Sequence, residues 1–210
     1  MVQDRTRVDI TGTPTRQQDD EETQKREGPW SPGIEHELLE SRTLLVSGPV
    51  TDKMCRTVVG QLLLLEDKDP ESPISVYINS PGGSADSGFA MYDMIRFVRC
   101  PVRTIVNGLC ASAAVLVFLA GDRESRLCLP HSRFLIHQPS TAGQGTASDL
   151  RITAQQVLKL RDRYNHIVSE ATGKKEAEVL EDASRDFWLD AEEAVDYGLV
   201  SRILTRRSEL

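Results

Sequence analysis

The chain has 210 residues, of which 39% are hydrophobic, and a formal net charge of −7. This length suggests one domain of ordinary size with residues left over for an extension. The acidic charge argues against nucleic acid as the main partner, because binding to phosphate groups requires a basic surface.

The apolar segments and the cysteines predict a cytoplasmic protein. No apolar stretch follows a basic N-terminal start, so we expect no secretory signal. The longest apolar run, Ala113 to Ala120, is well short of the roughly 20 residues that cross a bilayer. The four cysteines lie in apolar segments without C-x-x-C spacing, which predicts buried, reduced thiols and no metal site. They are Cys55, Cys100, Cys110 and Cys128.

Residues 1–33 differ from the rest of the chain. Their segment RQQDDEETQKREGPWSPG is charged, rich in Gln and Pro, and poor in aliphatic residues. Such a segment cannot bury enough apolar surface to fold alone. We therefore predict a mobile extension, or one that only a partner orders.

From Ile34 onward, short apolar runs alternate with helical patterns. Apolar runs bounded by turn residues predict strands over residues 42–48, 74–80, 102–108, 125–129 and 133–138. Helical spacing between the runs predicts helices over residues 51–67, 84–99 and 111–121. This alternation predicts an α/β fold built from parallel βαβ units.

The C-terminal third of the chain predicts one long helix and one short unit. The long helix covers residues 146–171 and stops at Thr172-Gly173. The apolar residues on one of its faces are Leu150, Ala154, Val157, Tyr164, Val168 and Ala171. Residues 189–203 predict a short helix closed at Gly198 and a last strand, and residues 204–210 form a tail.

A glycine-rich turn, Pro81-Gly82-Gly83, joins a predicted strand to a predicted helix. Glycine allows backbone geometry there that a side chain would forbid. The peptide N–H groups can then turn toward an anion, although a simple tight turn is the alternative. Neither G-x-G-x-x-G nor a P-loop is present, so we do not expect the chain to bind ATP itself.

Ser112 stands in the segment NGLCASAAVLVFLAG, between small residues and an apolar run. Two interpretations are open: a small residue that lets helices pack closely, or a nucleophile at the start of a helix. A serine is a poor nucleophile at neutral pH. It needs a base, a group that orients the base, and hydrogen-bond donors for the oxyanion.

His137 is the best candidate for the base. It ends the predicted strand RFLIH, and active sites of open α/β sheets lie beyond the carboxyl ends of the strands. A hydrogen-bonded structural histidine is the alternative. His36, His131 and His166 are weaker candidates, and no H-x-x-x-H spacing indicates a metal site.

Asp186 is the candidate for the group that orients the base. It precedes Phe187-Trp188, so we expect it to be partly desolvated, although an ordinary aspartate beside a helix is the alternative. Asp190, a few residues later, is predicted to cap a helix. Ser112, His137, Asp186 and the glycine-rich turn thus supply one candidate for every role.

Several segments in order resemble members of the caseinolytic (Clp) protease family, which are self-compartmentalising serine peptidases. They are INSPGGSADSGFAMYDMI, the Ser112 segment, RFLIHQPS, QGTASDLRITAQQVLKLRDRYNHIVSEATG and SRDFWLDAEEAVDYGLV. The resemblance covers about residues 34–203. It implies a crotonase-like spiral of repeated ββα units with a long protruding handle helix over residues 146–171.

The resemblance also implies roles for single residues. Ser112 matches the nucleophile, His137 the general base and Asp186 the orienting carboxylate. The backbone N–H groups of Gly83 and Ala113 match the oxyanion hole. If His137 must be neutral to accept a proton, activity should fall at acidic pH.

The family resemblance further implies an assembly and partners. Its members form heptameric rings that stack face to face through the handle helices. A hexameric AAA+ unfoldase docks on clefts at the ring surface, where Tyr77 and Phe97 match cleft positions, and feeds unfolded polypeptides to the chamber. The partner would spend the ATP, and the chain itself would need no cofactor, nucleic acid or membrane.

The chain departs from the family pattern at three places. The family usually reads A-S-M-G around the nucleophile, whereas this chain has Ala113 and Ala114 after Ser112. Loss of the Met side chain should widen the pocket for the residue before the scissile bond. Arg185 matches an inter-ring contact of the family, but Ser184 stands before it where the family commonly has an acidic residue. The segment 1–33, usually an axial gate, is unusual in sequence.

Two other functions are compatible with such a fold. One is an enzyme acting on coenzyme-A thioesters, which uses similar oxyanion loops but needs no Ser-His-Asp set. The other is a non-catalytic or conditionally active subunit of a mixed ring. The presence of all three candidate residues argues against both.

Overall fold

The computed structural model describes residues 32–210. The chain divides into two compact units, Met1–Glu37 and Leu38–Leu210. Of the first unit, only the beginning of helix α2 (Pro32–Glu40) is described. The predicted mobile extension over residues 1–33 therefore lies outside the described residues, apart from the first two residues of α2. The fold below is that of the second unit.

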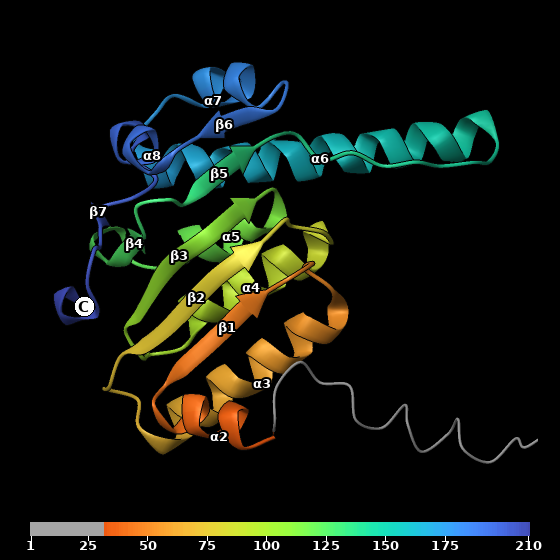
Figure 1. Cartoon of the computed structure of the whole chain (residues 1–210). Helices are drawn as coiled ribbons and strands as arrows, with labels where there is room; N and C mark the ends of the chain where they lie inside the picture. The colour runs from red at the N-terminus through yellow and green to blue at the C-terminus, as the bar shows by residue number, and fades with distance from the viewer. Residues whose placement is uncertain (1–31) are drawn as a thin grey trace, which may run out of the picture. The chain divides into compact units, whose positions relative to one another are not determined.

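A mostly parallel sheet forms the centre of this unit (Figure 1). Its main order is β1-β2-β3-β4-β7, all parallel, with β5 parallel to the end of β3 and β6 antiparallel to β5. The strands are β1 (Thr43–Ser47), β2 (Ile74–Ser80), β3 (Val102–Ala111), β4 (Arg126–Cys128), β5 (Arg133–Ile136), β6 (Phe187–Leu189) and β7 (Arg202–Ile203).

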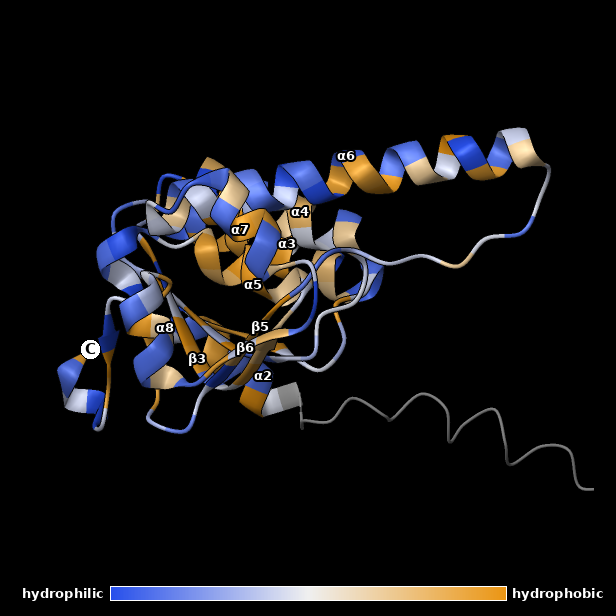
Figure 2. Ribbon diagram, turned by 90° about the horizontal axis from the view of Figure 1, so that it is seen from above, coloured by the Kyte–Doolittle hydropathy of each residue, from blue (hydrophilic) through white to orange (hydrophobic). Residues whose placement is uncertain are grey.

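Helices cover the sheet and build the C-terminal part of the unit. Helices α3, α4 and α5 lie on one face of the sheet (Figures 1 and 2). The helices are α3 (Asp52–Lys68), α4 (Ala85–Phe97), α5 (Ala113–Leu119), α6 (Ala147–Thr172), α7 (Glu176–Asp182) and α8 (Ala191–Tyr197). Two single turns of 3-10 helix, η1 (Arg123–Ser125) and η2 (Arg207–Glu209), complete the set. The predicted α/β architecture with parallel βαβ units is confirmed.

Strand β3 is three residues longer than the sequence predicts. The sequence predicts that the strand ends at Gly108, but it continues to Ala111, and α5 begins at Ala113 rather than Ala111. Beyond Asn107 the strand pairs with β5 instead of β4. The side chain of Asn79 accepts a hydrogen bond from the Leu109 N–H at 3.0 Å, which bridges the irregular stretch.

Helix α6 begins with a capping box, in which Thr146 and Asp149 exchange hydrogen bonds, and ends at Gly173 in a left-handed conformation. Only the second half of its predicted apolar face is covered. Tyr164 and Val168 are buried, whereas Leu150 and Ala154 are exposed. The first half of the helix extends beyond the sheet and includes apolar residues (Figure 2), of which Leu150, Ile152 and Leu158 are exposed.

Three of the four cysteines are buried, as predicted, and all four are free thiols. Cys55 is only partly buried, because it lies one turn before Val58, the first buried position of α3. Burial raises the pKa of the Cys110 and Cys128 thiols, in the second case to about 11. Among the described residues, no helix is both long and apolar enough to cross a membrane.

Candidate active site

Ser112 occupies a sharp turn between β3 and α5. Its φ is 56° and its ψ is −124°, a conformation that costs a non-glycine residue conformational energy. Two backbone hydrogen bonds hold it there: the Ser112 N–H donates to the Leu135 oxygen at 2.9 Å, and the Ser112 oxygen accepts from the Val115 N–H at 3.0 Å. Strained strand-to-helix turns of this kind expose a nucleophilic hydroxyl.

The Ser112 hydroxyl is not used to cap α5. Thr51, Ser84, Thr146 and Asp190, in contrast, all accept a hydrogen bond from the first turn of their helices, which confirms the predicted cap at Asp190. A strained backbone together with a hydroxyl that does not cap the helix suits a nucleophile better than a packing residue. The geometry therefore favours the nucleophile interpretation over the packing interpretation.

Gly82 lies against this turn and leaves no room for a side chain. A Cβ atom there would come within 2.5 Å of the Ala111 oxygen and 2.6 Å of the Ser112 Cβ. The residue also has a φ of 84°, which side chains disfavour. The glycine-rich turn is thus not a generic tight turn, because it packs directly against the backbone of the Ser112 turn.

The N–H groups of Gly83 and Ala113 border the same space. A parallel bridge between Val50 and Gly83 uses the Gly82 oxygen and the Ser84 N–H, and leaves the Gly83 N–H outside it. The Ala113 N–H is in the first position of α5, where the helix offers no acceptor. Two such N–H groups suit an oxyanion.

The pairing of β5 with β6 brings His137 and Asp186 together. Ile136 pairs with Phe187 across the two antiparallel strands, so the next residues outward are His137 and Asp186. The His137 Nδ1 lies 3.2 Å from the Asp186 Oδ1. Just beyond, the N–H of Gln138 donates to the Ala183 oxygen at 2.9 Å and fixes the two segments to each other.

Asp186 is more exposed than predicted. Its side chain is 65% exposed, against 30% for His137. The expectation of partial desolvation is therefore wrong for the isolated chain, because Phe187 is only half-buried and Trp188 points to the exposed side of β6. The contact with His137 does not depend on that burial, since the strand pairing sets it.

A cavity of about 440 Å³ lies between the Ser112 turn, the glycine-rich turn and His137. Ser112, His137, Gly83 and Ala113 all line it. The remaining wall is largely apolar, and its main contributors are Phe89, Leu116, Leu135, Val157, Leu160 and Tyr164. An extended peptide with an apolar side chain next to Ser112 fits these surroundings.

Tyr164 is a neighbour of the site that the sequence did not indicate. We predicted it only as part of an apolar helix face, but its hydroxyl lies 3.5 Å from the backbone oxygen of Ser112. The side chain is buried, and burial raises its pKa above the usual range. Helix α6 therefore contacts the Ser112 turn directly.

The other candidate residues lie away from this cavity. Tyr77 is half-buried against Ile105, Leu127 and Leu204, and Phe97, at the end of α4, is 76% exposed. Arg185 is exposed beside Asp186. Of the weaker histidines, His166 contacts Glu176 and Glu170 on the surface, which raises its pKa. In the described part of the chain, no cluster of His, Cys, Asp and Glu is arranged to hold a metal ion.

Comparisons with known proteins identify the family of this chain. The family model described as Clp protease matches residues 28–207. An ATP-dependent Clp protease proteolytic subunit 3 of Rhizobium meliloti (strain 1021) is 44% identical over 195 residues, which are 93% of this chain and all of that protein. A proteolytic subunit of Paracoccus denitrificans is 46% identical over 80% of this chain and 83% of its own.

A solved structure shows the same fold. A ClpP1 mutant from Listeria monocytogenes superposes with a TM-score of 0.77 at 36% sequence identity, over 83% of this chain and 98% of that one. The matches extend over strands, helices and the glycine-rich turn together. This chain belongs to the Clp protease family.

Proposed function

We propose that this chain is a serine endopeptidase subunit of an ATPase-assisted protein-degradation particle, in which Ser112, His137 and Asp186 cleave peptide bonds. The observation that carries the proposal is the single cavity lined by Ser112 and His137, with Asp186 at the far nitrogen of the imidazole. Family membership favours this activity over thioester chemistry on coenzyme A.

The proposed reaction follows from these positions. The Ser112 Oγ attacks the carbonyl carbon of the scissile bond, and the His137 Nε2 takes the hydroxyl proton and passes it to the leaving amine. The Gly83 and Ala113 N–H groups stabilise the negative oxygen of the tetrahedral intermediate, a contribution of about 10²–10³ in turnover for one donor. Water, activated by His137, then hydrolyses the Ser112 ester. No step requires a cofactor.

The apolar wall of the cavity points to an apolar residue before the scissile bond. Ala113 and Ala114 replace the Met and Gly usual in the family, and Ala113 presents only a methyl group toward α4 and the cavity. A Cβ on Gly88 of α4 would already lie 3.0 Å from the Ala113 oxygen, so the two helices are closely packed here. The small side chain of Ala113 leaves the cavity open to large apolar residues.

Assembly into stacked heptameric rings would cover the apolar residues that the isolated chain exposes. Leu150, Ile152 and Leu158 of α6 are between 42% and 56% exposed. They suit the proposed role of this helix as the inter-ring handle, and Arg185 suits a second inter-ring contact. Phe97 and Tyr77 suit the docking of a hexameric AAA+ unfoldase. We place this particle in the cytoplasm, with unfolded polypeptides as substrates.

A fluorogenic peptide assay of the purified chain tests the proposal. We expect Ser112→Ala to lose about 10⁶-fold in the rate of cleavage, because the nucleophile is removed. Ser208→Ala, at an exposed position of η2, is the matched control and should leave the rate unchanged.

The alternative, a non-catalytic ring subunit, makes the opposite prediction. In that case activity would appear only after addition of a different subunit and would survive Ser112→Ala. That result would overturn the proposed function and leave the chain a structural role.

A further inference from the structure

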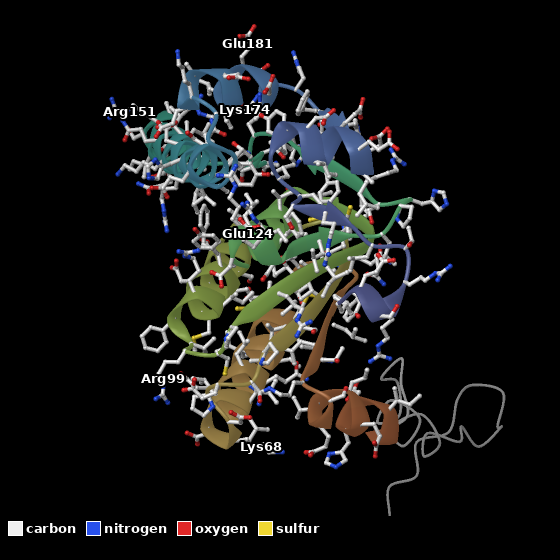
Figure 3. All side chains as sticks on the ribbon, turned by 90° about the vertical axis from the view of Figure 1, so that its left-hand side faces the viewer. Lys68, Arg99, Glu124, Arg151, Lys174 and Glu181 are labelled. Atoms are coloured by element: carbon white, nitrogen blue, oxygen red, sulfur yellow. The ribbon has the colours of Figure 1, made fainter. Side chains whose placement is uncertain are left out.

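A second cavity, of about 190 Å³, lies at the opposite end of α5 from Ser112. The C-terminal parts of α4, α5 and α6 line it. Three arginines from different elements line it: Arg96 of α4, Arg123 of η1 and Arg126 of β4. Glu124, labelled in Figure 3, and Ser125 lie between the last two arginines in the sequence. No part of the reaction described above uses this cluster.

Arg126 is the central residue of the cavity. It is only 2% exposed, and its Nη2 donates to the Ala171 oxygen in the last turn of α6 at 2.9 Å. Its Nε and Nη1 are buried without a hydrogen-bond partner. A buried charge with unpaired donors is costly, so proteins pair such groups with an anion.

Two carboxylates lie near the cluster, since Glu170 lines the cavity and Glu124 acts electrostatically on Arg126, but neither forms an ion pair with the arginines. Within residues 32–210, no ion pair involves any of the three arginines. Arg96 lies over the ring of Tyr92 at 5.8 Å, and Glu170, which also lines the cavity, lies 3.5 Å from His166 instead. Burial, together with the charges of Arg123 and Arg96, lowers the pKa of Arg126 to about 10.

We propose that this arginine cavity binds a small oxyanion, a phosphate or a carboxylate group, which pairs with Arg126. A guanidinium group forms strong charge-assisted hydrogen bonds to both anions, and the unpaired Nε and Nη1 of Arg126 supply the donors. Arg96 and Arg123, both exposed on their outer sides, complete a positive entrance. The anion would come either from solution or from an acidic side chain of a second copy of this chain.

Binding of inorganic phosphate to the full chain tests the proposal at constant ionic strength. We expect phosphate, but not chloride, to raise the thermal unfolding temperature in a saturable way. Arg123→Gln and Arg96→Gln should each weaken that binding about tenfold, as loss of one charge-assisted hydrogen bond does. Arg56→Gln, exposed on α3 and away from the cavity, is the control. Arg126 itself is kept, because it also holds the end of α6.

The protein concentration at which the assembly dissociates distinguishes the two sources. If the anion is a carboxylate of a second copy, phosphate has no effect on the unfolding temperature, and Arg123→Gln dissociates at a higher protein concentration than Arg56→Gln. If both cavity variants match Arg56→Gln in phosphate binding and in dissociation, the proposal is wrong, and Arg126 stays unpaired or turns to Glu170.

Discussion

Replacing His137 with alanine is expected to lower the rate of peptide cleavage by about 10⁶-fold, nearly as much as loss of the nucleophile. Asp186→Ala should cost less, about 10⁴-fold, since it only orients the base and stabilises its protonated form. The graded order follows from the geometry, because His137 lines the cavity with Ser112 whereas Asp186 contacts only the outer nitrogen of the imidazole. Single-turnover assays with a fluorogenic peptide measure both losses.

His131→Ala is the control for this series. His131 is exposed between β4 and β5, six residues before His137, and has no place in the cavity. Its replacement should leave cleavage unchanged. Equal losses at His131 and His137, or an Asp186→Ala variant of full activity, would contradict the proposed roles.

Gly82→Ala is expected to abolish most activity although Gly82 contributes no side chain to the reaction. The added Cβ would lie 2.5 Å from the Ala111 oxygen and 2.6 Å from the Ser112 Cβ, so the strained turn must shift. A displacement of about 1 Å at a reacting group can cost about 10²-fold in rate. Crowding should also lower the free energy of unfolding by about 1–3 kcal/mol. Kinetics and thermal unfolding measure the two effects.

Two other glycine variants separate the effect of backbone strain from the effect of crowding by the added Cβ. Gly48→Ala has the same backbone strain, with a φ of 85°, but nothing lies within 4 Å of the new Cβ. Gly60→Ala, in the middle of α3, has neither strain nor a close neighbour and should stabilise the helix by up to about 1 kcal/mol. If Gly82→Ala kept the activity of Gly48→Ala, the close packing against the Ser112 turn would be unimportant.

The sequence predicted most of the α/β framework, because long apolar runs and helical periodicity are local signals. The prediction from sequence failed where tertiary contacts override local sequence signals. The strand predicted to end at Gly108 continues to Ala111, because the Asn79 side chain accepts a hydrogen bond from the Leu109 N–H and β5 pairs with the last three residues of β3. Strand β6 and helix α7 were missed: β6 has only three residues, and α7 buries only Val179, so neither segment shows a periodic apolar pattern.

The candidate site could be predicted only as an inventory of residues. His137 and Asp186 are 49 positions apart, and they meet because β6, a strand that the sequence did not predict, pairs with β5. The exposure of Asp186 was likewise unpredictable, because it depends on which side of β6 faces outward. The strained conformation of Ser112 has no sequence signal beyond the small residues around it.

We propose that a neighbouring imidazole activates the Ser112 hydroxyl in the strained turn after β3. Reaction of the assembled chain with a fluorophosphonate, followed by mass spectrometry of its peptides, tests this claim most directly. We predict covalent modification at Ser112, at a rate reduced by orders of magnitude in His137→Ala. Absence of modification at Ser112, or an equal rate of modification in the unchanged chain and in His137→Ala, would contradict this claim.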